Sequence, residues 1–140
     1  ILKRLKAPKK DIERIKFCIG AHMHDLKNDM NENQIRRYIV NNTKYLQELF
    51  WVRQADYSAC KDDVNENAGV KKWKDIIKKM KEEGVPFTRK QLNVTADDLI
   101  SAGVRQNSLG KVFDKLLEEV AVLPKLNERE KLVELALQIN

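Results

Sequence analysis

Apolar residues recur every three to four positions along most of this chain, and that spacing constrains the fold more than any other feature. Between residues 66 and 83, Val70, Trp73, Ile77 and Met80 would share one face of a helix. No alternation of apolar and polar residues persists, Gly and Pro are few, and charged residues make up 34% of the chain. This combination predicts an all-α protein.

We expect a multi-helix bundle of roughly seven helices in two sub-bundles. The predicted helices cover residues 9–24, 32–41, 43–61 and 66–83, a short segment from Thr95 to Gly103, a longer one after Asn107 or Ser108, and a last one after Asn127. Arg36 and Arg37 are expected to face solvent. Trp51 and Trp73 could stack on nucleic-acid bases, but their apolar neighbours favour the core.

A domain boundary is predicted at Gly84 and the extended segment 85–87 that follows it. Residues 1–84 hold 19 Lys and Arg against 13 Asp and Glu, whereas residues 85–140 hold 8 of each. We therefore predict a helical body over 1–84, which carries the whole positive excess, and a C-terminal helical tail over 85–140. A positive field of this size attracts a polyanion such as RNA, or an acidic protein.

The turn between the two helices of the tail is a candidate phosphate site. Gly103 suits the left-handed end of the first helix, and Gly110 falls in the first turn of the second, where no Cβ obstructs the backbone. Helix N-terminal amides beside small and cationic side chains suit an anion. The candidate contacts are Arg105, Asn107, Ser108, Gly110 and Lys111, with Lys71, Lys74 and Lys78 as outer contacts. The alternatives are an ordinary helical corner and a solvated lysine face.

A second candidate is a metal site near the end of the first helix. Its possible ligands are His22, His24 and Asp25, with Asp56 as a further carboxylate. His-Asp is the doublet of the HD phosphohydrolases. Residues two apart on a helix point about 200° apart, however, so the two histidines would not easily share one ion.

Nothing in the sequence predicts catalysis by this chain alone. It has no strand-borne carboxylate pair, no glycine-rich triphosphate turn and no nucleophile with a credible base. Cys18 and Cys60 are expected to be buried thiols in a reducing compartment. With no membrane-length apolar run and no leader, we expect a cytoplasmic protein, and the start at Ile1 suggests part of a longer one.

Two groups of residues resemble a known family. In the tail they are Asp98-Leu99-Ile100, Gly103, Leu109-Gly110, Leu116-Leu117, Pro124 and Asn127-x-Arg129-x-x-Leu132, and in the body they are Arg36-Arg37-Tyr38-Ile39 and the run from Leu49 to Asp56. The pattern resembles the C-terminal part of bacterial tRNA nucleotidyltransferases, the family of CCA-adding enzymes and poly(A) polymerases. Residues 1–84 are similar to the second half of its HD-like region.

The resemblance implies a non-catalytic, RNA-binding role in tRNA processing. This portion would grip the backbone of tRNA or another structured RNA, while an N-terminal head domain adds nucleotides with Mg²⁺; this chain would need no cofactor. Asp56 would be a last metal ligand, or a structural carboxylate paired with Arg53 or Arg36. Two alternatives remain: part of an HD-type metal-dependent phosphohydrolase, and a protein-interaction bundle whose apolar start (Ile1, Leu2, Leu5) docks on a partner. None of the three involves a membrane.

Overall fold

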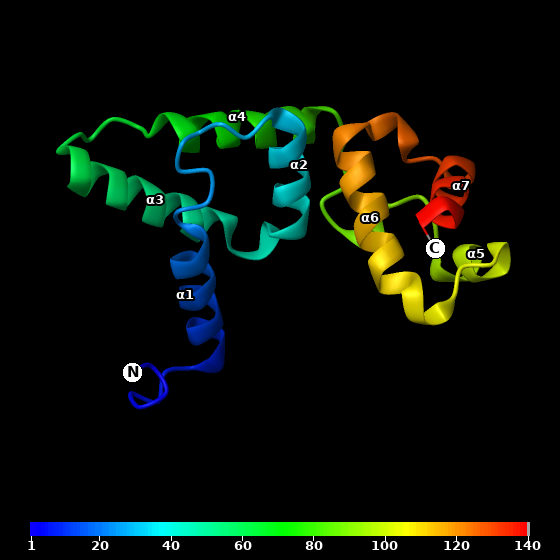
Figure 1. Cartoon of the computed structure of the whole chain (residues 1–140), viewed down its shortest axis with the longest axis horizontal. Helices are drawn as coiled ribbons and strands as arrows, with labels where there is room; N and C mark the ends of the chain where they lie inside the picture. Colours follow the sequence, from blue (N-terminus) through cyan, green and yellow to red (C-terminus); the bar gives the residue numbers. More distant parts are fainter. Residues whose placement is uncertain (140) are drawn as a thin grey trace. The chain divides into compact units, whose positions relative to one another are not determined.

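The computed structural model describes residues 1–139, which form seven α-helices and four short 3₁₀ turns (Figure 1). The predicted all-α fold is confirmed. The helices are α1 (Lys9–Ala21), α2 (Glu32–Asn41), α3 (Leu46–Lys61), α4 (Ala68–Glu82), α5 (Ala96–Ala102), α6 (Leu109–Val122) and α7 (Arg129–Ile139). The 3₁₀ turns are η1 (Thr43–Tyr45), η2 (Arg89–Gln91), η3 (Gln106–Ser108) and η4 (Pro124–Leu126). Within this part of the chain, no helix has both the length and the apolar character that a membrane span requires.

The chain divides into two compact units, each made of two separate stretches. Unit 1 combines residues 1–30 with 44–74, and unit 2 combines residues 31–43 with the chain from Asp75 onward. The sequence predicts two domains separated at one boundary, 1–84 and 85–140, and that division stays a prediction. Helix α2 therefore belongs with the tail helices in unit 2.

Unit 1 is built around Trp73, whose side chain is fully buried. The Phe50 ring meets it edge to face at 6.4 Å, and the Arg53 guanidinium carbon lies 5.8 Å from its ring centroid. Helix α1 packs on α3 in the same unit. The prediction that Trp73 is a core residue is confirmed, whereas Trp51 is 64% exposed, so the same prediction for Trp51 is wrong.

Unit 2 is built around α6, which packs against α2 and α7, while α5 packs against α7. The fully buried side chains of this unit follow the helical period, as predicted, and are Ile35, Ile39, Met80, Leu99, Val112, Leu116, Val120 and Leu132. Burying this apolar surface is the main term that stabilises the unit.

Caps and glycines set the helix ends of unit 2. Thr95 accepts a hydrogen bond from the Asp98 amide and Asp98 returns one to the Thr95 amide, so α5 opens with a capping box. Gly103, at φ +111°, ends the helix in the left-handed conformation that was predicted for it. Before α7, the Asn127 side-chain oxygen accepts a hydrogen bond from the Asn93 amide at 2.8 Å.

Candidate nucleic-acid interface

The predicted phosphate site lies on the surface of unit 2, between α5 and α6. The chain leaves Gly103, buries Val104, and then passes through η3 into α6. Arg105, Gly110 and Lys111 are exposed there. Asn107 is exposed on the same turn and Ser108 is half-buried, so the candidate residues lie together, while their role stays a prediction.

Part of the predicted anion chemistry is already used inside the protein. The Ser108 amide donates to the Arg105 carbonyl at 2.9 Å, and the Leu109 amide donates to the Gln106 carbonyl. Ser108 occupies the N-cap position of α6 but makes no capping bond; its hydroxyl lies 3.4 Å from the Asn107 side-chain oxygen. Because these two amides already donate hydrogen bonds inside the protein, phosphate recognition here would depend on cationic side chains and on access to Gly110.

Gly110 leaves the start of α6 open to approach. A methyl group built at its Cα would meet no other atom within 4 Å. Neighbouring Lys111 is exposed and forms no ion pair with any residue of 1–139. A ligand phosphate could therefore reach both the backbone and the ammonium group.

Most other cations of unit 2 are neutralised by a nearby carboxylate. Arg89 pairs with Asp114 at 2.6 Å and Lys115 with Glu118 at 2.9 Å. Arg129 pairs with Asp98 in the same way. Within residues 1–139, Lys111 shares its uncompensated charge with four other exposed lysines of the unit, which are Lys78, Lys81, Lys90 and Lys125.

The three outer lysines are all exposed on α4 but belong to different units. Lys71 and Lys74 lie in unit 1, and Lys78 lies in unit 2. The Lys74 ammonium pairs with the Glu66 carboxylate at 2.8 Å, and this pairing reduces the positive potential around Lys74. Lys71 and Lys78 make no ion pair within residues 1–139. Exposure of this kind fits a solvated helix face as well as contact with an RNA backbone.

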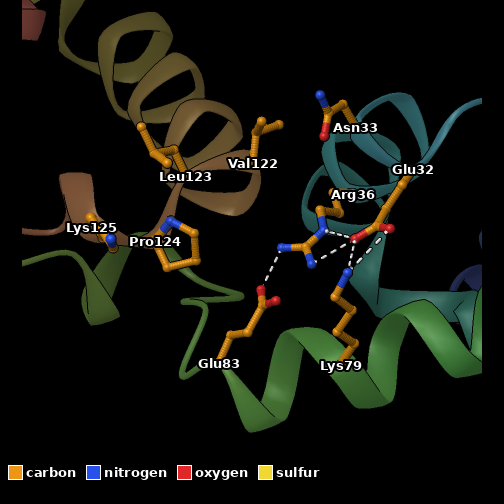
Figure 2. Close-up of a pocket in the computed structure, with 9 residues that line it drawn as sticks. All are labelled: Glu32, Asn33, Arg36, Lys79, Glu83, Val122, Leu123, Pro124 and Lys125. Atoms are coloured by element: carbon orange, nitrogen blue, oxygen red, sulfur yellow. Dashed lines mark hydrogen bonds and ion pairs between the residues drawn. The ribbon is translucent and has the colours of Figure 1, made fainter.

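Unit 2 also holds a charged cluster that the sequence did not predict (Figure 2). Arg36, expected to face solvent, is buried, with only 4% of its side chain exposed. Its guanidinium contacts Glu32 at 2.8 Å and Glu83 at 2.7 Å, and donates to the Ala121 carbonyl at 2.9 Å. Lys79 reaches the same Glu32 at 3.0 Å.

These charges line a cavity of about 510 Å³, and Lys125 lines it as a third cation. The hydrogen bond from Arg36 lowers the pKa of Glu83, and hydrogen bonds from Lys79 and then Arg36 lower that of Glu32. Two cations thus face two ionised carboxylates. We interpret the cluster as a structural brace that satisfies the end of α6. The one sequence signal that could have indicated the burial of Arg36 is its place in the helix between Ile35 and Ile39, which are both buried.

The metal-site candidates of unit 1 have other partners in the structure. The His22 Nδ1 lies 2.7 Å from the Ile19 carbonyl, and the His24 ring meets Trp73 edge to face. Asp25 accepts hydrogen bonds from the Met30 amide and the Trp73 indole N–H, each at 3.0 Å. Although burial alone would raise the pKa of Asp25, these two bonds and Lys72 lower it, so the carboxylate is ionised and engaged.

His22 and Asp56 do line one cavity of about 300 Å³, together with the exposed Cys60. The Cys60 thiol lies 4.0 Å from the Asp56 carboxylate, and Cys60 is exposed rather than buried as expected. Arg36, one of the partners expected for Asp56, is engaged by Glu32 and Glu83 instead. Among residues 1–139, no three His, Cys, Asp or Glu side chains are grouped so that they could hold a metal ion.

No protein-family model, curated protein or solved structure matches this chain. The likeness to tRNA nucleotidyltransferases therefore stays a prediction, and its support is the motif residues themselves.

Proposed function

We propose that this chain binds structured RNA, foremost tRNA, as the non-catalytic C-terminal part of a cytoplasmic tRNA nucleotidyltransferase or poly(A) polymerase-like protein. The supporting observation is the turn of unit 2, where exposed Arg105 and Lys111 flank the unobstructed Gly110. Gly110 is one of the residues that resemble the family, and Arg105 and Lys111 lie between such residues. Phosphate contacts of this kind supply affinity and orientation rather than sequence preference.

In this proposal the chain contributes binding and no chemistry. Nucleotide addition, and the Mg²⁺ that it requires, belong to an N-terminal domain of the parent protein. Arg105 and Lys111 hold the RNA backbone near the start of α6, while Lys71, Lys74 and Lys78 supply weaker outer contacts. The Arg36 cluster supports this surface indirectly, because it fixes the opposite end of α6.

Two measurements test the proposal. The first is a titration of the chain with tRNA between about 50 and 200 mM salt. We expect the logarithm of the association constant to fall linearly with the logarithm of the salt concentration, with a slope of about −0.9 for each phosphate contact. Absence of binding at the lowest salt would refute the RNA-binding role. The second incubates the chain with tRNA lacking its 3′ end, nucleotides and Mg²⁺. Incorporation of labelled nucleotide would refute the assignment as non-catalytic.

A further inference from the structure

A groove lined by apolar side chains lies between α1 and α3 of unit 1. It encloses about 430 Å³, a volume suited to a small planar ligand. Its walls are Ile15, Ile19, Trp51 and Val52, all of them exposed. Ile19 is 65% exposed and Trp51 64%, so most of the indole is accessible to solvent. Apolar side chains gathered in this way indicate a binding surface rather than scattered surface residues.

The floor of the groove is neutral. Cys18 lies there, 7% exposed. Burial, and then the nearby Glu48 carboxylate, raise the pKa of its thiol, so it stays protonated. A flat apolar ring entering the groove would meet no charge at the floor.

Two charged side chains face each other across the groove. Arg14 from α1 and Glu48 from α3 approach to 4.0 Å, which is too long for a hydrogen bond. Arg14 uses its other terminal nitrogen to reach Asp11 at 3.1 Å. Glu48 accepts no hydrogen bond from any residue of 1–139. An ion pair that no hydrogen bond closes, with N–H donors on Arg14 and a carboxylate acceptor on Glu48, therefore lines the groove beside Trp51.

We propose that this groove holds one unpaired guanine of an RNA strand, stacked on Trp51. Guanine presents N–H donors beside a carbonyl acceptor, so Glu48 accepts from its N1–H and N2–H₂ while Arg14 donates to its O6. No other RNA base offers two adjacent donors next to an acceptor on that edge. Stacking on an exposed aromatic ring is the usual way in which proteins hold unpaired bases.

The charge of unit 1 complements the strand that carries the base. Unit 1 holds 14 Lys and Arg against 9 Asp and Glu, a net +5, while unit 2 holds 13 against 12. Phosphates on either side of the guanine would lie against the more positive unit. The inference rests on the proposed RNA-binding function and adds a second contact surface, separate from the turn at Arg105.

The test uses short single-stranded oligouridines of equal length, one of them with a single guanosine and the others with a single adenosine or cytidine. Binding to the full chain is followed by tryptophan emission and by filter retention. We expect the guanosine oligomer to bind about tenfold tighter than the others and to quench Trp51. Because Trp73 is fully buried, Trp51→Phe should abolish most of the emission change while filter binding persists.

Three variants make the proposal falsifiable. Glu48→Gln should remove the preference for guanosine, and Trp51→Ala should weaken every oligomer by about tenfold through lost stacking. Glu13→Gln, a matched change at an exposed carboxylate of α1, should retain both properties. Thermal melts that match the parent chain establish that each variant is folded.

The opposite outcomes are equally specific. Equal affinity for all oligomers, or a Trp51→Ala variant that binds as well as the parent, would overturn the guanine site, as would self-association that involves Trp51 without oligomer binding. A double variant Arg105→Ala/Lys111→Ala should keep the guanosine preference. If this variant loses tRNA binding but keeps the guanosine preference, the turn and the groove are separate binding sites. If it keeps tRNA binding, the proposed role of the turn fails while the groove is still tested by the oligomers.

Discussion

Nη1 of Arg36 lies 2.7 Å from Oε2 of Glu83, and this contact joins helix α2 to the turn that follows α4. The same nitrogen donates to the Ala121 carbonyl at 2.9 Å, near the C-terminal end of α6. One buried guanidinium thus connects three segments of unit 2 that are far apart in the sequence. A cation at a helix C-terminus also interacts favourably with the helix dipole.

Replacing Arg36 should destabilise the protein strongly. Arg36→Met leaves Glu83 and the Ala121 carbonyl without their partner, at a cost of about 3 kcal/mol in the free energy of unfolding. The measurement is urea unfolding followed by circular dichroism. Arg37→Met is the matched control, because Arg37 pairs with Glu119 on the surface, with 40% of its side chain exposed. It should cost less than about 1 kcal/mol; equal losses in both variants would contradict the role of Arg36 as a brace.

Acid should weaken the same cluster. The pKa values of Glu83 and Glu32 are lowered in the folded state from an ordinary value of 4.5. A lowered pKa contributes stability that is present above the unfolded pKa and is lost as pH falls through the folded value. Unfolding free energies measured from neutral pH downward should therefore decline below about pH 4.5. In Arg36→Met the decline in unfolding free energy should be shallower. The same decline in the variant and the parent chain would contradict the claim that Arg36 lowers the pKa values of these glutamates.

The predictions that were confirmed concern features set by residues close in the sequence, and those that were wrong concern features set by distant residues. Local chemistry could be predicted: the Thr95 cap and the left-handed Gly103 depend on neighbours in the sequence, and the structure confirms both. The apolar stripe of α4 is confirmed at Val70, Trp73 and Met80, whereas Ile76 is buried in place of the predicted Ile77, which is half-buried. Arg36 and Trp51 could not be read in this way. The environment of Arg36 is set by residues 47 and 85 positions away, and the exposure of Trp51 depends on which helices surround α3.

Asp25 should be a stabilising residue of unit 1. Asp25→Ala removes the acceptor of both the Met30 amide and the buried Trp73 indole N–H, and φ at this position is +55°, which alanine adopts poorly. We expect a loss of about 2 kcal/mol in unfolding free energy. Asp29→Ala, at an exposed carboxylate four residues on, should change stability by about 0.5 kcal/mol or less. A near-neutral Asp25→Ala would show that the Trp73 bond contributes nothing.

Gly110 offers a substitution in which stability and binding should move in opposite directions. Alanine meets no atom within 4 Å there, so Gly110→Ala should stabilise the start of α6 by about 0.4–1 kcal/mol. If a phosphate approaches this backbone, the added methyl group should weaken tRNA binding in the same protein. Thermal melts and tRNA titrations on one preparation measure both effects. Stabilisation with unaltered tRNA affinity would exclude close approach of RNA at this position.

The most direct test of the RNA-binding surface is the salt dependence of tRNA binding by Arg105→Ala/Lys111→Ala. Its control is Lys90→Ala/Lys125→Ala, which removes the same charge from exposed positions of unit 2 that form no ion pair within residues 1–139. We predict that the turn variant binds tRNA more weakly and that the slope of log affinity against log salt falls by about 1.8, for two lost phosphate contacts. The control should change less in both quantities. Equal affinity and equal slope in the two double variants would contradict the account.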